Sequence, residues 1–562
     1  MNFGRSTNGS GEPIPLTESG REGSPRQVVT LAFLAEQLPD NFIAEQLARS
    51  LCAETDASVV LVRLEPHDGP IAMNDEGQPD ACLNGEFHLP PQLREIDTGF
   101  HSLTLLCSRS EPPTPPGMDS MLRQLTRQFR YVLIQTRVDE SPASWLFELL
   151  LRSNLAYLFL KPATKDVYQL DLVMKEARAR CRNGGVHVKP VACLAKGEQM
   201  DGFDLLIQRV AGPVHMFVRD CPGFDGVQET STAATGSFSA DLRRLAREIG
   251  GCLVGLALSS GAAKGFAHIG VIQVLEENGI NVDVVAGSSM GAYVGALWAH
   301  GCDGRELERL ARELETRWSL WSLIDLTFPP HRGFLGGFAV KRRLMQSIGH
   351  ARFADLVRPL RVVAANLATL ERVVFASGEV ADAVHASTAV PGICVPITID
   401  GETYTDGGIV DPLPVDVLRE MGVARVIAVN VIPTPERIRH GIEAEIELAR
   451  HHRKQRRKLF GKAPPPERQV NYFARGSMLE ILLRSVQSGQ IRMAETSCQQ
   501  ADVVLRPDIY DDRWLDYRRP GKFIALGRQA AERHLEEIKS LVARKEVSHD
   551  AQFAPESVAS II

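Results

Sequence analysis

The stretch of residues 282–297 constrains the fold of this chain more than any other. It reads as a short valine-rich strand, a sharp turn and a helix lined with small residues. The turn carries Gly287, Ser289 and Gly291 in a Gly-x-Ser-x-Gly pattern. A serine on a strained turn leaves no room for side chains two positions away, and the helix that follows directs its N–H groups toward the serine. The stretch therefore predicts an α/β sheet with Ser289 as a nucleophile, with an ordinary tight turn as the alternative.

A loop of small residues lies shortly before this turn. It follows an apolar strand predicted over residues 252–258 and opens a helix predicted over residues 266–277. Its central residues are Ser260, Gly261, Ala262, Ala263, Lys264 and Gly265. Small residues let backbone N–H groups approach an anionic atom, and the start of a helix adds its dipole. The loop predicts an oxyanion hole, with a plain strand-to-helix turn as the alternative.

An aspartate followed by two glycines ends a later strand. Asp406 enters a turn formed with Gly407 and Gly408. An aspartate in this setting either forms the turn or acts as a catalytic base. His268, the histidine closest in sequence to these motifs, is interpreted as a structural residue.

Length and composition set the remaining bounds. A chain of 562 residues predicts two to four domains, and a net charge of -6 gives no reason to expect nucleic acid as a partner. Its 10 cysteines are scattered without a Cys-x-x-Cys pair, so we expect neither a disulfide framework nor a metal site. The first residues do not resemble a signal peptide, and no long apolar run occurs. These features predict a cytoplasmic protein.

The chain divides into four predicted parts. Residues 1–25 are expected to be disordered, and residues 546–562 to form a loose tail. Residues 26–248 alternate strand and helix patterns, which predicts a doubly wound α/β domain with a parallel sheet. Its first strand-to-helix turn, residues 35–40, lacks a phosphate-binding motif, so a regulatory or packing role is expected. Residues 249–545 form the second predicted domain.

Several segments carry local expectations. Residues 65–94 are predicted to be a loop, residues 360–365 and 372–376 paired strands, and residues 522–544 one helix. Two further segments allow an alternative each. Residues 318–338 are expected to be core, with a lipid-facing mouth as the alternative, and the basic run 453–458 a solvated loop, with contact to anionic lipid as the alternative.

The small-residue loop, Gly-x-Ser-x-Gly and Asp-Gly-Gly occur in an order that resembles the patatin-like phospholipase family, in particular the neuropathy target esterase and bacterial patatin-like proteins. The resemblance covers about residues 252–542, including segments 386–391 and 479–502. It implies a three-layer α/β/α catalytic domain and a serine acyl hydrolase acting on phospholipids or lysophospholipids. It also implies Ser289 as nucleophile, Asp406 as proton acceptor, and no catalytic histidine, cofactor or metal.

The chain departs from the family pattern in the small-residue loop. Ser260 and Ala262 stand where the family usually has glycine, and Lys264 where arginine is common. Alanine resists a positive φ angle, so the oxyanion hole is where the pattern is weakest. Two rival functions follow: a lipid- or protein-binding scaffold with weak hydrolysis, and an acyltransferase. An apolar substrate and the absent spanning segment predict peripheral contact with the inner membrane surface, and the sequence specifies no oligomeric state.

Overall fold

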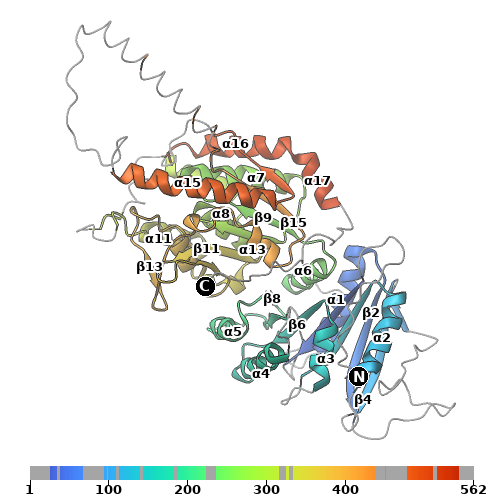
Figure 1. Cartoon of the computed structure of the whole chain (residues 1–562). Helices are drawn as coiled ribbons and strands as arrows, with labels where there is room; N and C mark the ends of the chain where they lie inside the picture. The colour runs from blue at the N-terminus through green and yellow to red at the C-terminus, as the bar shows by residue number, and fades with distance from the viewer. Residues whose placement is uncertain are drawn as a thin grey trace, which may run out of the picture.

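Two eight-stranded sheets organise the chain (Figure 1). The computed structural model describes residues 26–34, 38–67, 94–97, 99–108, 113–138, 144–180, 188–200, 202–222, 236–315, 325–327, 333–434, 436, 439, 450, 478–509 and 516–543. The first sheet holds strands β1–β8 and the second holds β9–β16. The predicted disordered segment 1–25, the predicted tail 546–562 and the basic run 453–458 lie outside the described residues.

The first sheet has the strand order β3-β4-β2-β5-β1-β6-β7-β8. Every neighbouring pair is parallel except β3 and β4. Its strands are β1 (Gln27–Phe33), β2 (Val59–His67), β3 (Arg94–Asp97), β4 (Phe100–Ser108), β5 (Tyr131–Arg137), β6 (Leu155–Leu160), β7 (Val188–Cys193) and β8 (Met216–Val218). Its helices are α1 (Asp40–Thr55), α2 (Pro115–Gln128), α3 (Ser144–Arg152), α4 (Thr164–Arg180), α5 (Phe203–Ala211) and α6 (Ser237–Ile249). The sequence placed a loop over residues 65–94, but β2 continues to His67 because it pairs with β4 along its whole length.

The second sheet has the order β13-β14-β11-β10-β9-β15-β16, with β12 paired to β11. Its strands are β9 (Val254–Leu258), β10 (Val284–Ser288), β11 (Leu360–Asn366), β12 (Arg372–Phe375), β13 (Ile397–Ile399), β14 (Glu402–Asp406), β15 (Arg425–Val429) and β16 (Val503–Leu505). Its helices are α7 (Ala267–Glu277), α8 (Met290–His300), α9 (Gly304–Arg312), α11 (Phe338–Ile348), α12 (Val380–Ser387), α13 (Val415–Glu420), α15 (Met478–Gln499), α16 (Pro520–Arg533) and α17 (Leu535–Ala543). The predicted pair of strands β11 and β12 is confirmed, and it is antiparallel. The single helix predicted over residues 522–544 is wrong, because the chain breaks at His534 into α16 and α17.

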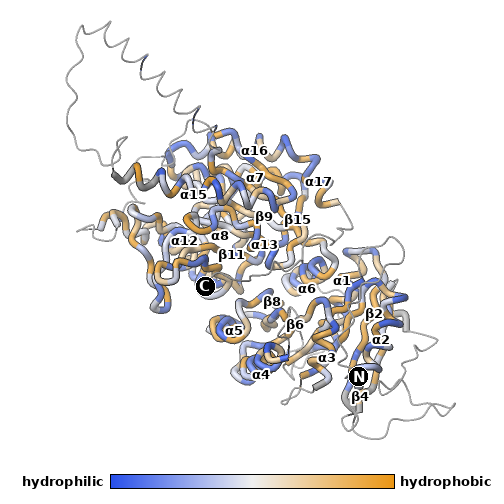
Figure 2. The backbone as a smooth tube through the Cα atoms, in the orientation of Figure 1, coloured by the Kyte–Doolittle hydropathy of each residue, from blue (hydrophilic) through white to orange (hydrophobic). Residues whose placement is uncertain are grey.

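Alternate residues of the second sheet face two separate cores, as the two-residue period of a strand requires. Leu256 and Val285 pack in one core with residues of α7, α8 and α16. Ala257 and Ala286 pack in the other with residues of α13, α15 and α6. Figure 2 shows the apolar strands inside and hydrophilic residues along α16 and α17. The sheet and its two helical layers form the three-layer α/β/α arrangement expected for the catalytic domain.

The two sheets are joined through α6 and through polar contacts. Helix α6 lies between them and packs on α1 (Figure 1). The Arg352 guanidinium pairs with the buried Asp204 carboxylate at 3.1 Å. On β11, the Arg361 guanidinium donates to the His215 carbonyl at 3.0 Å. The first sheet is therefore packed against the second sheet through specific partners.

Candidate active site

Three adjacent strands bring Ser289 and Asp406 together from distant parts of the chain. Strand β10 lies parallel to β11, with Ser288 beside Val363. Strand β14 lies antiparallel to β11 on its other side, with Asp406 beside Ala364. The last residues of β10 and β14 therefore flank consecutive residues of β11. This register places the two predicted catalytic residues at the same edge of the sheet.

Ser289 occupies the turn between β10 and α8 in a strained conformation. Its φ is 54° and its ψ is -121°, a region that non-glycine residues rarely adopt. A Cβ atom on Gly287 would lie 2.6 Å from the Gly291 carbonyl oxygen, and one on Gly291 would lie 2.2 Å from the Leu258 carbonyl oxygen. Only glycine fits at either position. The turn has the geometry of a nucleophile elbow.

The side chains of Ser289 and Asp406 are hydrogen-bonded inside the protein. Ser289 Oγ donates to Asp406 Oδ2 at 2.6 Å, and the Gly408 N–H donates to Asp406 Oδ1 at 2.7 Å. Both residues are buried. Burial raises the pKa of Asp406 to about 6, while the hydrogen bonds from Ser289 and Gly408 act in the opposite direction. Asp406 is thus an ionised carboxylate near pH 7 with an increased affinity for a proton, which suits a general base.

Ser387 at the end of α12 holds the turn in place, and the sequence motifs did not single it out. Its hydroxyl accepts the Ser289 N–H at 2.8 Å and donates to the Val363 carbonyl at 2.6 Å. It thereby connects the strained residue to β11. Segment 386–391 is part of the family resemblance, and this is the one feature of the sequence from which a role for Ser387 could have been predicted.

The small-residue loop follows β9 and opens the short 3-10 helix η1 (Ala262–Phe266). The N–H groups of Gly261 and Ala262 have no acceptor in the described part of the chain, and both residues line the same cavity as Ser289. Ala262 has a φ of 47°, so the alanine occupies the left-handed conformation that glycine favours. The departure from the family pattern therefore costs strain but keeps a glycine-like backbone.

The other loop residues have separate positions. The Ser260 N–H donates to the Pro412 carbonyl at 2.8 Å, which leaves it unable to serve an oxyanion. Ala263 is fully buried, and Lys264 is mostly buried and lines the cavity. A Cβ on Gly265 would lie 2.4 Å from the Met290 side chain, so glycine permits the close contact between η1 and α8.

His268 supports the loop from α7. Its Nε2 lies 2.9 Å from the Ser259 carbonyl, and the residue is fully buried. Burial lowers the pKa of His268 to about 4, so the ring is neutral at pH 7 and donates Nε2–H to that carbonyl. Its two ring nitrogens make no hydrogen bond to Ser289 or Asp406. The structure agrees with the interpretation of His268 as a structural residue.

A cavity of about 130 Å³ opens onto the dyad. Helix α15 covers part of it with Val486, Gln487 and Gln490. Its apolar lining consists of Val390, Pro391, Ile409, Val431, Ile432, Pro433 and Val486. Segment 333–336 borders this region, because the Phe334 N–H donates to the Ile393 carbonyl at 2.8 Å. For the described part of segment 318–338, the expected core is wrong for Leu326, Phe334 and Phe338, which are exposed, whereas Gly333, Gly336 and Gly337 are buried.

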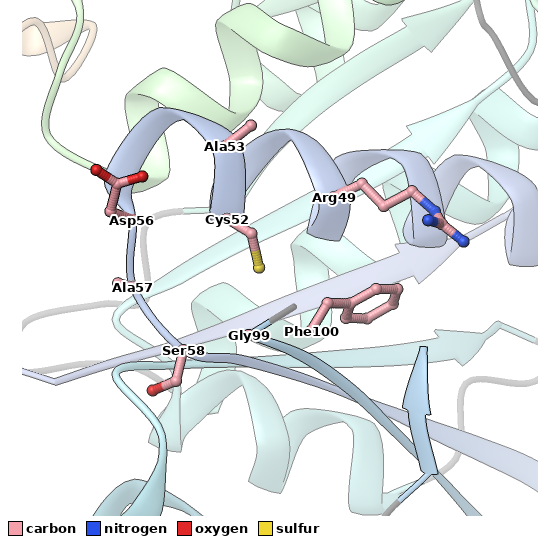
Figure 3. Close-up of a pocket in the computed structure, with 8 residues that line it drawn as sticks. All are labelled: Arg49, Cys52, Ala53, Asp56, Ala57, Ser58, Gly99 and Phe100. Atoms are coloured by element: carbon pink, nitrogen blue, oxygen red, sulfur yellow. The ribbon is translucent and has the colours of Figure 1, made fainter. Parts of the chain in front are cut away.

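A second cavity, of about 420 Å³, lies in the N-terminal sheet (Figure 3). It sits at the end of α1, where Ser58 precedes β2 and Gly99 precedes β4. Parallel sheets bind ligands at the carboxyl ends of their strands, and this is the opposite edge. The side chains of Arg49 and Asp56 point away from each other, so the cavity offers no converging polar groups (Figure 3). It does not resemble a nucleotide site.

The described residues hold neither a metal-binding group nor a membrane-spanning helix. Within those ranges, no three histidine, cysteine, aspartate or glutamate side chains gather into a group suited to a metal ion. None of the helices in the same ranges combines the length and apolar character needed to cross a membrane.

The second sheet carries the match to a known family. Residues 256–419 match the family model described as patatin-like phospholipase. Residues 256–419 form a patatin-like phospholipase domain. The match begins in β9 and ends in α13. It includes the small-residue loop after β9, Ser289 and Asp406.

Curated relatives of this patatin-like domain are fungal lysophospholipases. The chain is 34% identical over 196 residues to Lysophospholipase NTE1 of Pyricularia oryzae, covering 34% of this chain and 13% of the relative. It is also 34% identical over 193 residues to Lysophospholipase NTE1 of Yarrowia lipolytica, covering 34% of this chain and 14% of the relative. The chain thus spans a small part of the length of these relatives.

Solved structures overlap with the chain only loosely. VipD from Legionella pneumophila covers 52% of this chain and 67% of its own, with 14% identity and a TM-score of 0.27. A ParA family ATPase from Chlorobium tepidum TLS covers 40% of this chain and 98% of its own, with 11% identity and a TM-score of 0.29.

Proposed function

We propose that the chain is a serine acyl hydrolase that cleaves carboxylic esters of phospholipids or lysophospholipids. The observation that carries this proposal is the 2.6 Å hydrogen bond from Ser289 Oγ to the buried Asp406 carboxylate, at the floor of a largely apolar cavity. The patatin-like domain and the lysophospholipase relatives support the choice of lipid esters. The catalytic groups are Ser289 as nucleophile and Asp406 as base.

The proposed reaction has two steps. Asp406 accepts the proton of Ser289 as Oγ attacks the ester carbonyl, and the N–H groups of Gly261 and Ala262 stabilise the negatively charged oxygen. Asp406 then gives the proton to the departing alcohol, which leaves an acyl-serine. Water attacks this acyl group with Asp406 again as base, and it releases the fatty acid and restores Ser289. Histidine takes no part in either step.

The experiment that tests this function combines covalent labelling with turnover. The wild-type protein should react with a fluorophosphonate probe at one serine and should hydrolyse a lysophospholipid. Ser289→Ala should lose both, while Ser288→Ala, on the adjacent buried serine of β10, is the matched control and should keep the label. Equal labelling of Ser289→Ala would move the nucleophile elsewhere. Labelling without hydrolysis would favour the scaffold, and transfer to an added alcohol in preference to water would favour the acyltransferase.

The protein is proposed to meet its substrate by peripheral contact with the inner membrane surface, from the cytoplasm. The exposed Phe334 and Phe338 support this contact, as do the basic run 453–458 of the sequence and a substrate that resides in membranes. Flotation with vesicles that contain anionic phospholipid should weaken with added salt, because exposed charges are screened over about 8–10 Å at ordinary ionic strength. Binding that ignores salt and needs detergent for release would contradict it.

A further inference from the structure

The proposed reaction gives no role to the side chain of Ser260, a polar residue of the cavity wall. The Ser260 side chain lines the cavity with Ser289, and only 5% of the residue is exposed. Its backbone N–H donates to the Pro412 carbonyl, which fixes the backbone from which the side chain extends. In the described part of the chain its hydroxyl has no hydrogen-bond partner, and it is reached from the cavity that it lines. A hydroxyl in this position is free to form a hydrogen bond with a molecule that occupies the cavity.

Gln490 of α15 lies beside this hydroxyl. A Cβ atom on Gly408 would lie 2.9 Å from Ser260 Oγ, 2.9 Å from Gln490 Nε2 and 3.0 Å from Asp406 Oδ1. The three side chains therefore converge on one point of the cavity wall. The Gln490 amide also makes no hydrogen bond to any other described residue, and it offers a donor and an acceptor whichever way it is turned.

The position beside Asp406 determines what these two groups meet. Asp406 must deliver a proton to the departing oxygen, so the alcohol part of the ester has to lie next to this carboxylate. Most of the remaining cavity wall is apolar and suits an acyl chain. Ser260 and Gln490 thus form a small polar surface on the side of the leaving alcohol.

We propose that Ser260 and Gln490 are specificity-determining residues that bind a hydroxyl group on the leaving alcohol. The ligand class is an alcohol with a free hydroxyl on the carbon adjacent to the esterified carbon, as in a glycerol monoester. The inference rests on the proposed hydrolase function. It assigns a role to Ser260 where the family pattern has glycine, since glycine provides no hydroxyl.

Three octanoate esters of nearly equal size test this subsite: the 2-hydroxyethyl, 2-methoxyethyl and propyl esters. The methoxy ester withdraws electrons as the hydroxy ester does but donates no hydrogen bond. A site that pairs with a substrate hydroxyl discriminates against analogues that lack it. We expect the wild-type kcat/KM to favour the hydroxyethyl ester over both others by about tenfold, a modest value because Gln490 is only half-buried.

Substitutions then assign the preference to the two residues. Ser260→Ala and Gln490→Leu should each bring the ratio of hydroxyethyl to propyl ester to about one or two, and the ratio cancels any effect on chemistry common to both substrates. Ser485→Ala on the exposed face of α15 is the control and should keep the wild-type ratio. Equal wild-type rates, or a preference that persists in both variants, would overturn the inference while hydrolysis itself stands. Loss of all turnover and probe labelling in the wild type would instead remove the hydrolase function, and this inference with it.

Discussion

Asp406 and Glu248 are both nearly inaccessible to solvent, but their surroundings differ. Asp406 is 4% exposed and Glu248 6% exposed. Among the described residues, the donors to Asp406 are the neutral Ser289 hydroxyl and Gly408 N–H. Glu248, on α6 at the junction of the two sheets, accepts from the Lys189 ammonium and lies 2.7 Å from His215 Nε2. The two carboxylates are buried to a similar extent, but only the charge of Glu248 is balanced by a positively charged neighbour.

The two carboxylates consequently shift in opposite directions. Burial raises the pKa of Asp406 to about 6. Burial acts the same way on Glu248, but the charges of His215 and Lys189 and their hydrogen bonds outweigh it and lower the pKa of Glu248. Burial also lowers the pKa of His215, so Lys189 supplies the charge near pH 7. The site keeps a carboxylate that readily accepts a proton, and the junction keeps one that stabilises the fold.

The largest difference should appear when Asp406 loses its charge. Asp406→Asn removes the base, and we expect kcat/KM to fall by about 10³–10⁴. Because the pKa of Asp406 in the folded protein lies above its ordinary value of 3.8, its charge costs stability at pH 7. The free energy of unfolding of the variant should therefore be equal to that of the wild type or higher by up to about 3 kcal/mol. Ester turnover and urea unfolding measure both effects. An active variant, or one that is strongly destabilised, would contradict this description of the site.

The same chemical change at the junction should have the opposite outcome. Glu248→Gln leaves the Lys189 ammonium without its carboxylate, and we expect the free energy of unfolding to fall by about 3–5 kcal/mol. Because the folded pKa of Glu248 is lowered, its contribution is complete above its unfolded pKa and is lost as the pH falls through the folded pKa. Probe labelling per folded molecule should persist. Glu532→Gln, at an exposed pair, is the control with a change below about 0.5 kcal/mol.

Local patterns predicted the parts of the site that depend on neighbouring residues. Gly287 and Gly291 identify Ser289 because the turn itself excludes side chains, and Asp406 is identified by the glycines that follow it. The sequence also predicted the strand-and-helix alternation, since each element has its own hydrophobic period. The roles of Ser289 and Asp406 remain proposals, although the structure brings the two side chains together.

Contacts between distant segments had no comparable signal. Ser387 bonds to Ser289 across 98 residues, and Lys189 reaches Glu248 across 59. Gln490 enters the cavity from a helix whose pattern indicates only amphipathic packing. The break at His534 was also missed, because residues 522–544 contain no proline and only Gly527, which lies within α16 rather than at the break. Such features depend on how the elements pack, and a single sequence does not specify that.

The acidity of Asp406 should be visible in the pH dependence of the reaction. A protonated Asp406 cannot accept the Ser289 proton, so kcat/KM should be constant above about pH 7 and fall toward tenfold per pH unit below about pH 6. Octanoate released from a neutral ester, quantified by chromatography, gives the rate at each pH. Circular dichroism at pH 5 should show the folded protein. A midpoint near pH 4 would mean that the carboxylate of the working enzyme is not desolvated.

The smallest expected effect concerns the backbone strain at Ala262. Here the site differs from the rest of the fold in backbone conformation and not in charge. Alanine with a φ of 47° costs about 1–2 kcal/mol, and Ala262→Gly removes this cost while adding about 0.5–1 kcal/mol of backbone entropy in the unfolded chain. The net change in the free energy of unfolding should therefore stay within about 1 kcal/mol, measured by urea unfolding. Ala263→Gly, one residue later in η1 and without positive φ, has no strain to release and should lose about 1 kcal/mol. Because the backbone at Ala262 is already glycine-like, Ala262→Gly should change kcat by less than about threefold, whereas the loss of one oxyanion donor costs about 10²–10³. A large gain in kcat would show that the alanine turns its N–H away from the oxyanion, and that the strain impairs the site.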